Sequence, residues 1–397
     1  MRKAYFDHIA ATHLHPEALR AMLPYLGDVY GNPQSLHSAG QQALAAVDAA
    51  RSEVAGLIGA GSEEVYFTAS GSEANNLAVK GLAQAYQAKG KHIVVSAIEH
   101  LSVLNPVKSL EKLGFSSTTV PVDGTGLIDP AEVEKAIRKD TILVSVMTAN
   151  SEVGTVEPVA EIARVCRARN VLFHTDAVAA AGSISLNVRD LDVDALSLAG
   201  DQFYGPKGSA ALFLKKGTRI VPLVEGGIQE GGRRAGTENV AAIVGLGKAA
   251  AIARAGMEAK AARAIPLRDL LIEELVCRVD HVVLTGHRTR RLPHHASFCI
   301  EFVEGEGMLL LLDMQGISAS SGSACTSKAL KVSHVLLAMG LDHALAQGSL
   351  VFSLIDGTGR EDVEYLLDGF PPVIERLRKM SPLYTQYLKE RNDALQR

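Results

Sequence analysis

The feature that most constrains the fold of this chain is a regular alternation of short apolar runs with longer segments of helical periodicity between residues 65 and 214. The apolar runs have the length of buried strands, and the segments between them repeat their apolar residues at helical spacing. Such an alternation predicts an α/β layer with a mostly parallel sheet flanked by helices. The predicted strands span 65–68, 93–96, 117–120, 142–147, 171–175, 193–198 and 210–214, and the predicted helices 73–89, 101–113, 130–139 and 158–169.

The pattern changes on both sides of this layer. Helical periodicity precedes it over 16–26 and 37–59, and a Gly-rich turn at 226–236 leads into an Ala-rich helical stretch at 237–265. We expect a large α/β domain over 16–257 and a smaller α+β domain formed by 1–15 and 258–397. The elements predicted for the small domain are helices at 267–278, 306–315 and 361–379, strands near 281–284 and 296–302, and a charged helical tail at 380–397.

Composition excludes several classes of protein. Of the 397 residues, 47% are hydrophobic and 21% are charged, which is typical of a globular chain. The formal net charge of -4 does not favour nucleic acid as a partner. The opening MRKAYFDHIAATH lacks the apolar core of a signal peptide, and we expect no run of membrane-spanning length. The four cysteines lack CxxC or CxxH spacing, so we expect a cytoplasmic protein without a disulfide framework or zinc site.

In parallel sheets, sites form at the carboxyl ends of the strands, so the loops that follow the strands carry the candidate chemistry. The segment FTASGSEANNLA, residues 67–78, has the pattern of a strand, a Gly/Ser turn and a helix. Such a turn presents free N–H groups to an anion such as phosphate, and Ser70 and Ser72 add hydroxyl donors. An ordinary capped helix has the same pattern, and the residues alone leave both interpretations open.

Two titratable side chains follow other predicted strands. His100 comes directly after one strand, where a histidine is either a structural residue or a catalyst. Asp176, in FHTDAVAAAG, follows another. Its carboxylate suits the protonated nitrogen of a pyridine cofactor, and it equally suits the start of a helix.

Cys325 lies in SSGSACTS, a run of small residues. An exposed thiol in a flexible loop suits a mobile nucleophile or a sulfur carrier, whereas a tight loop with a small apolar residue would have the same composition. Cys166, Cys277 and Cys299 lie in helical or apolar segments and are predicted to fill the core.

The segment SLAGDQFYGPKG, residues 197–208, follows a predicted buried strand and ends in a Gly-Pro-Lys-Gly turn. It resembles the segment that carries the cofactor lysine in the cysteine desulfurases, the NifS/IscS branch of the class V aminotransferase family. Further segments resemble the same family in the same order along essentially the whole chain. They are YFDHIAAT, YGNPQSLHSAG, FTASGSEANN, IEH, EVGTVEPV, HTDA, YGPKG, GTEN, SSGSACTS and SHVLLAMGL. The resemblance implies the fold type I of transferases that depend on pyridoxal phosphate (PLP).

The resemblance also implies roles for individual residues. Gly71 and Ser72 would cradle the cofactor phosphate, His100 would stack on the pyridine ring, and Asp176 would pair with the pyridine nitrogen. Thr237, in GTEN, would reach the phosphate of a neighbouring subunit, which implies a homodimer with shared sites.

For the cysteine loop, the resemblance implies catalysis of sulfur transfer. Cys325 matches the residue that takes sulfur from the substrate and carries it away as a persulfide. His100 and Cys325 are therefore the candidate catalytic residues.

The clearest departure from the family is the absence of the lysine that holds PLP as a Schiff base. Gln202 occupies its position, Asp201 replaces the preceding histidine, and Ala199 replaces a serine that contacts the phosphate. An amide is not a nucleophilic amine, and loss of a positioned acid/base group costs about 10²–10⁴-fold in rate. Lys207 is no substitute, because the family has a lysine there beside the cofactor lysine.

Other positions around the same pocket also depart from the family. Ser151 and Ala179 replace an asparagine and a glutamine that face the phenolic oxygen of the cofactor. Val351 replaces the arginine that binds the substrate carboxylate, and a valine offers no charged fork to a carboxylate. The remaining departures are Gly231 in place of an arginine, and His8 and Ile9 in place of paired asparagines.

These substitutions beside an intact cysteine loop predict a cysteine desulfurase-like protein of sulfur mobilisation and iron–sulfur cluster assembly with a degenerate PLP site. In the first hypothesis, Cys325 relays sulfur to an iron–sulfur scaffold or another acceptor, or ligates a cluster, and no PLP need bind. In the second, the chain is an enzyme that holds PLP or pyridoxamine phosphate (PMP) non-covalently and acts on an altered amino acid, with Asp201 or His100 moving protons. In the third, it is a non-catalytic subunit that partners an active desulfurase.

Overall fold

The computed structural model describes residues 2–322 and 332–395. Its largest feature is a seven-stranded sheet with the strand order β2-β8-β7-β6-β5-β3-β4. The strands β7, β6, β5, β3 and β4 run parallel, whereas β8 is antiparallel to both of its neighbours. These strands are β2 (Val65–Thr68), β3 (His92–Ser96), β4 (Ser116–Val120), β5 (Thr141–Ser145), β6 (Leu172–Asp176), β7 (Ala195–Ala199) and β8 (Ala210–Leu214). The predicted α/β fold with a mostly parallel sheet is confirmed.

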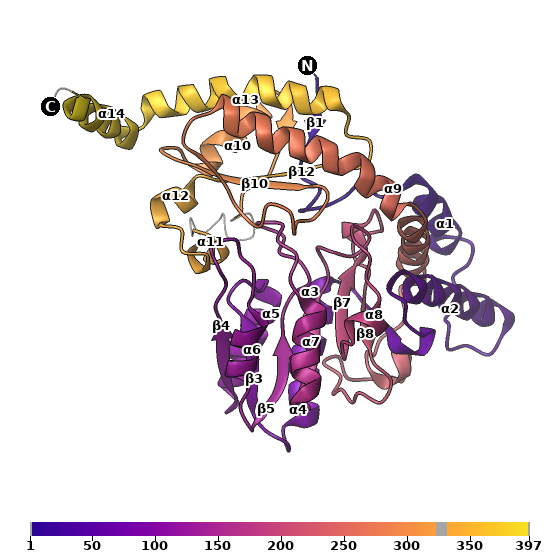
Figure 1. Ribbon diagram of the computed structural model, residues 1–397. Coiled ribbons are helices and arrows are strands. Elements are labelled where there is room, and N and C mark those ends of the chain that lie inside the picture. The colour runs from indigo at the N-terminus through magenta and orange to yellow at the C-terminus, as the bar shows by residue number, and fades with distance from the viewer. Residues whose placement is uncertain (1, 323–331, 396–397) are drawn as a thin grey trace.

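Helices flank this sheet, and a smaller set of strands lies beyond its upper edge in Figure 1. In the first two thirds of the chain the helices are α1 (Pro16–Leu26), α2 (Ser38–Ile58), α3 (Gly71–Asn76), α4 (Leu82–Tyr86), α5 (Leu101–Glu111), α6 (Pro130–Ala136), α7 (Val159–Ala168), α8 (Val188–Leu191) and α9 (Val240–Arg278). A π-helical segment, Leu77–Gly81, joins α3 to α4. The helix predicted at 73–89 therefore forms, but its middle turn is wider than an α-helix.

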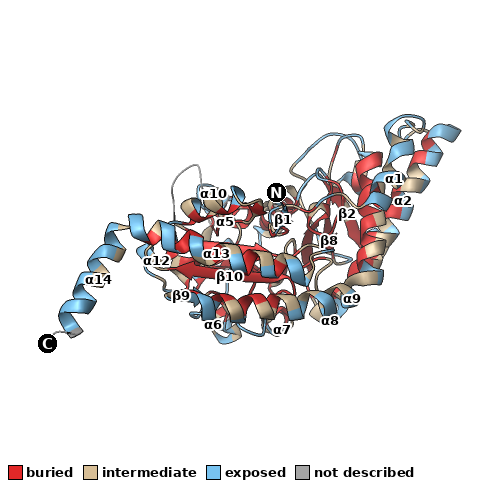
Figure 2. Cartoon of the chain, turned by 90° about the horizontal axis from the view of Figure 1, so that it is seen from above, coloured by how far each residue is buried: buried red, intermediate tan, exposed pale blue. Residues whose placement is uncertain are grey.

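The smaller set of strands consists of two sheets. One is antiparallel with the order β12-β10-β9, and the other pairs β1 with β11 in parallel. The strands are β1 (Ala4–Tyr5), β9 (Val282–Leu284), β10 (His295–Ile300), β11 (Ile317–Ser318) and β12 (Ser349–Ser353), and the nearby helices are α10 (Gly305–Asp313), α11 (His334–Ala338), α12 (His343–Gln347), α13 (Arg360–Met380) and α14 (Pro382–Leu395). Figures 1 and 2 show α14 projecting from the body with an almost entirely exposed surface.

The two separate helices predicted at 237–265 and 267–278 are one continuous helix, α9, with Pro266 in its interior. A proline removes one backbone donor and leaves the carbonyl four residues earlier without its partner. Here Pro266 is exposed, so water can bond that carbonyl. The helix continues because its two halves, before and after Pro266, each pack apolar residues into the core.

The expectation that no segment has membrane-spanning character is wrong for α9. By length and composition alone this helix is long and apolar enough to cross a membrane, but half of its most apolar stretch is buried inside the fold. It packs along α1 and α2. A core helix of a globular protein satisfies the same criterion, and we interpret α9 as one.

The apolar core consists of several clusters, and α9 contributes to two of them. Its first half, with Leu246 and Ala250, packs into the cluster beside the large sheet. Its second half, with Leu271 and Leu275, packs against the antiparallel sheet. The division between residues 257 and 258 stays a prediction, and this change of packing partner along α9 supports it.

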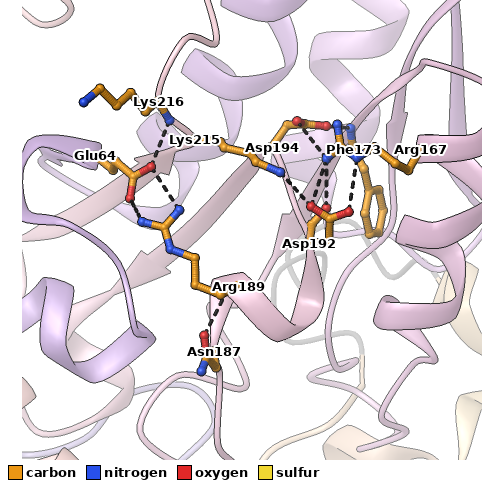
Figure 3. Close-up of polar contacts among 9 residues, drawn as sticks. All are labelled: Glu64, Arg167, Phe173, Asn187, Arg189, Asp192, Asp194, Lys215 and Lys216. Atoms are coloured by element: carbon orange, nitrogen blue, oxygen red, sulfur yellow. Dashed lines mark hydrogen bonds and ion pairs between the residues drawn. The ribbon is translucent and has the colours of Figure 1, made fainter.

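A network of hydrogen bonds and ion pairs lies at the edge of the large sheet where β6 and β7 begin (Figure 3). Asp194 accepts the backbone N–H of Phe173 at 2.9 Å and a guanidinium N–H of Arg167 at 3.2 Å. Nearby, Asp192 accepts from Lys215 at 2.6 Å, and Glu64 pairs with Arg189. These contacts lie at the edge opposite the carboxyl ends of the parallel strands, so they stabilise the sheet without entering the candidate site.

We predict that Asp194→Ala lowers the free energy of unfolding by about 2 kcal/mol, because it leaves the buried N–H of Phe173 without an acceptor. Urea denaturation measures the change. The control is Asp190→Ala on exposed α8, for which we expect a change within about 0.5 kcal/mol. Equal effects from the two substitutions would contradict the role assigned to Asp194.

Candidate functional site

The turn after β7 places residues 200–202 at the carboxyl edge of the sheet, as a short 3-10 helix. The N-terminal segment holds this turn from outside. The carbonyl of Asp201 accepts both the backbone N–H and the hydroxyl of Thr12, at 3.1 and 2.7 Å. The carbonyl of Gln202 lies 3.1 Å from Nε2 of His8. Two residues of the N-terminal segment thus hold the backbone of residues 201 and 202.

A chain of hydrogen bonds connects two of the residues proposed from the sequence, His100 and Asp176. Nδ1 of His100 lies 2.6 Å from the hydroxyl of Ser102, and that hydroxyl accepts from the amide of Asn75 at 2.8 Å. The same Asn75 amide nitrogen donates to Oδ2 of Asp176 at 2.6 Å. Asn75 and Ser102 were not proposed from the sequence; nothing in helical periodicity marks them as linkers between two strand ends.

Asp176 is the last residue of β6 and is buried. Burial raises the pKa of its carboxyl, and the N–H of Val178 and the amide of Asn75 partly oppose that rise. A buried carboxyl of this kind gains most from a cationic partner, because a positive charge offsets the cost of desolvating the carboxylate.

Gly71, Ala199 and Val178 lie close together where α3 begins. A Cβ on Gly71 would lie 2.6 Å from a methyl carbon of Val178 and 3.4 Å from the Cβ of Ala199, so only glycine fits. Ser72 and Thr237 are both exposed, on the first turn of α3 and in the loop before α9. Among the described residues of this chain, neither side chain is hydrogen-bonded to Asp176 or to Asn75.

The substituted positions lie in different environments. Gln202 is buried, and its side-chain amide makes no hydrogen bond to the described part of the chain. Ala179 is half-buried against the main core cluster. Burial raises the pKa of Asp201, whereas Lys207 is exposed beyond the turn.

A pocket of about 490 Å³ is lined by other residues of the proposed site. His100, Ser151 and Val351 all line it, together with Ile9. Val351 is buried in β12, and its backbone bonds Ser320 in both directions, at 2.7 and 3.1 Å. An apolar side chain therefore faces the place where the family resemblance implies a carboxylate-binding arginine.

Two glutamates that line this pocket, the buried Glu99 and the half-buried Glu152, were missed in the sequence. Glu99 accepts from Ser96 and from the N–H of Met147, its other oxygen has no hydrogen-bond partner among the described residues, and burial raises its pKa to about 8. Burial raises the pKa of Glu152 to about 7, and Ser333 donates to it. Glu99 lies in the segment IEH and Glu152 in SEVG. The sequence of a loop does not indicate whether its carboxyl groups are removed from solvent.

Cys325 lies outside the described residues, and the two ends of the chain around it reach this pocket. Gly322 and Ser333 both line it and both lie against Glu152. Of the other cysteines, Cys166 and Cys299 are buried as predicted, but Cys277 is exposed on α9. Its apolar neighbours suggested a core position, but the helix is oriented so that Cys277 faces solvent.

Among residues 2–322 and 332–395, no group of three or more His, Cys, Asp or Glu side chains is arranged to hold a metal ion.

Comparison with known proteins places these features in a family. The family model described as aminotransferase class-V matches residues 4–366. A cysteine desulfurase IscS of Dictyoglomus turgidum is 48% identical over 381 residues, covering 96% of this chain and 97% of that protein. A cysteine desulfurase IscS of Methanosarcina thermophila is 46% identical over 382 residues, covering 96% and 94%. A solved structure described as a NifS-like protein has a TM-score of 0.89 at 34% identity, covering 94% of this chain and 100% of that one.

We predict that Glu99→Gln flattens the pH dependence of stability between pH 6.5 and 8. The folded-state pKa of about 8 lies above the ordinary value of 4.5. Glu99 therefore stabilises the fold fully below pH 4.5, and this stabilisation is lost progressively as the pH rises through 8. Each unit of difference in pKa corresponds to about 1.4 kcal/mol. Urea denaturation at several pH values measures the slope.

Exposed Glu161→Gln is the matched control and should keep the slope of the unaltered chain. If Glu99→Gln and Glu161→Gln give the same slope as the unaltered chain, Glu99 is not a neutral buried acid.

Proposed function

The chain belongs to the class-V aminotransferase family and is similar over nearly its whole length to cysteine desulfurases, and on that premise we propose that it relays sulfur through Cys325 rather than releasing it by covalent PLP chemistry. It would serve sulfur mobilisation and iron–sulfur cluster assembly. Its PLP site would be degenerate.

The observation that carries this proposal is the buried Gln202 at the carboxyl end of β7. His8 donates a hydrogen bond to its carbonyl, which supports a fixed position for this residue. The nearest lysine in sequence, Lys207, is exposed. An amide at this point cannot form the covalent bond to the cofactor that the family uses.

The relay step needs a thiolate and a persulfide donor, and no cofactor. The thiolate of Cys325 would attack the terminal sulfur of a persulfide on a donor protein. One S–S bond forms at Cys325, the S–S bond of the donor breaks, and the donor leaves as a thiolate. A thiolate of the acceptor would then attack the terminal sulfur of the Cys325 persulfide, and Cys325 would leave as a thiolate. Both exchanges are balanced, and Cys325 returns to its starting state.

Glu152 and His100 would support this step from the pocket that both line. With its pKa raised to about 7, Glu152 is poised to hold or release a proton near neutrality at the pocket that both ends of the Cys325 loop reach. The buried Val351 offers no charge to an amino-acid carboxylate, which supports a protein persulfide as the sulfur source instead of free cysteine.

The family is PLP-dependent, and the residues present fit only part of that cofactor. Asp176 and His100 would hold the ring, and Gly71 would leave room for the phosphate; when bound, the cofactor supplies an electron sink. The site does not fit covalent attachment. The buried, hydrogen-bonded Asp176 favours a second candidate function, in which PLP or PMP binds non-covalently and an altered amino acid is the substrate.

An absorbance spectrum of the purified protein tests this second candidate. A PLP or PMP band that dialysis removes would support it. No binding even at high PLP concentration would exclude it and leave the relay.

For partners, desulfurases of this kind act as homodimers with acceptor and scaffold proteins, and we propose the same here, in the cytoplasm. Cys325 would contact the acceptor and could ligate its cluster. A non-catalytic subunit of an active desulfurase is the remaining alternative. Native mass spectrometry after co-expression with such a desulfurase decides it, because exclusive homodimers exclude the mixed complex.

We predict that Cys325 gains one sulfur atom when the protein is incubated with an active desulfurase and cysteine. Peptide mass spectrometry after alkylation measures a persulfide at that residue. Cys325→Ser should abolish the transfer.

Cys277 provides the matched control, since it is an exposed thiol that does not line the pocket. Cys277→Ser should leave transfer unchanged. Persulfide on Cys277 at the same level as on Cys325, or none on Cys325, would contradict the relay.

We also predict that Gln202→Lys alone restores less than about 1% of the sulfide release of an active desulfurase, because Val351 and Ala179 still leave the substrate and cofactor without their partners. Sulfide release from cysteine in the presence of PLP is the measurement. Robust activity from this one change would show that the remaining site is intact.

A further inference from the structure

A second pocket, lined in part by Gln202, lies between α9 and the loop that follows β12. Its volume is about 70 Å³, and it is lined by His8, Gln202, His294, Lys260 and Asp356 among others. One buried water needs roughly 10–15 Å³ by the same measure, so the space accepts roughly five to seven non-hydrogen atoms. The proposed relay makes no use of this pocket.

His8 is held neutral in one tautomer by its contacts. The backbone N–H of Asp356 donates to the Tyr204 hydroxyl at 2.6 Å, and that hydroxyl lies 3.3 Å from Nδ1 of His8. Nε2 of His8 lies 3.1 Å from the carbonyl of Gln202, which can only accept. His8 therefore donates from Nε2 and accepts at Nδ1, and burial lowers its pKa to about 4.

The ring of His294 lies tilted against that of His8, with ring centroids 4.5 Å apart. It is only 6% exposed, and neither ring nitrogen is hydrogen-bonded to any part of the chain that the structure describes. An unpaired polar group that is buried costs about 1–3 kcal/mol. A ligand that supplies a hydrogen bond to His294 would recover that cost.

The pocket also carries one more positive than negative charge. Lys260 and Arg263 both pair with Asp356, at 3.3 and 3.1 Å, so two cations share one carboxylate. Lys260 also lies over the Tyr204 ring, 4.6 Å from its centroid. The histidines are neutral, and Met257, Leu267 and Leu354 contribute apolar wall.

We propose that this pocket binds a small 2-hydroxy monocarboxylate, with its carboxylate at Lys260 and Arg263 and its hydroxyl at His294. The single surplus positive charge matches a monoanion, and the apolar walls favour an organic one. A hydroxyl suits a neutral imidazole, since each can donate or accept. A free amino acid is disfavoured because its ammonium group would lie beside two cations.

The probe is L-lactate, which has six non-hydrogen atoms, and isothermal titration calorimetry measures its binding to the full chain. We expect one site per chain. Propionate lacks the hydroxyl and should bind about tenfold more weakly, and lactamide lacks the charge and should not bind measurably. Inorganic phosphate that binds as tightly as lactate would overturn the proposal in favour of an unselective anion site.

Two substitutions test the contacts. Lys260→Met should weaken L-lactate binding at least tenfold, whereas Lys248→Met, on the same helix but paired with Glu17, should leave it unchanged. His294→Phe should weaken binding of L-lactate to the level of propionate and leave the affinity for propionate unchanged. Equal losses for both ligands would show that His294 only shapes the fold.

A gain of affinity keeps the proposal testable even if those variants do not fold. Asp356→Asn removes the internal competitor for both cations, and we expect L-lactate to bind about tenfold more tightly. Unchanged or weaker binding by a folded Asp356→Asn variant, or no saturable binding to the unaltered chain, would overturn the proposal.

Discussion

The site depends on one constraint, the fixation of the turn after β7. Thr12 bonds the carbonyl of Asp201 twice, and His8 bonds that of Gln202. These contacts determine where residue 202 lies whatever its side chain is. The chemistry of this edge of the sheet therefore depends on side-chain identity, and we propose that a glutamine there preserves the fold of the family without its covalent bond to PLP.

Two buried regions meet at this turn. On one side, His100, Ser102, Asn75 and Asp176 form a hydrogen-bonded chain that would suit a pyridine ring. On the other, a neutral histidine pair and two cations surround a small pocket. We propose that the first has lost its covalent cofactor and that the second has gained a ligand of its own.

Sequence patterns predicted much of the fold because the large sheet uses short strands buried on both faces, whose apolar runs are easily recognised. They failed where burial overrides local preference. Pro266 suggested a break, yet α9 continues because both halves are packed. Cys277 suggested core and is exposed. Motif order singled out His100 and Asp176 as candidates. Their linkers Asn75 and Ser102, and the glutamates Glu99 and Glu152, became visible only when strand ends distant in sequence were brought together.

The central claim is that this chain forms no covalent bond to PLP. The most direct measurement is borohydride reduction of protein saturated with PLP, followed by intact mass and peptide mapping. The account predicts no stoichiometric pyridoxyl adduct on any lysine. One adduct per chain, on Lys207 or another lysine near the pocket, would contradict it.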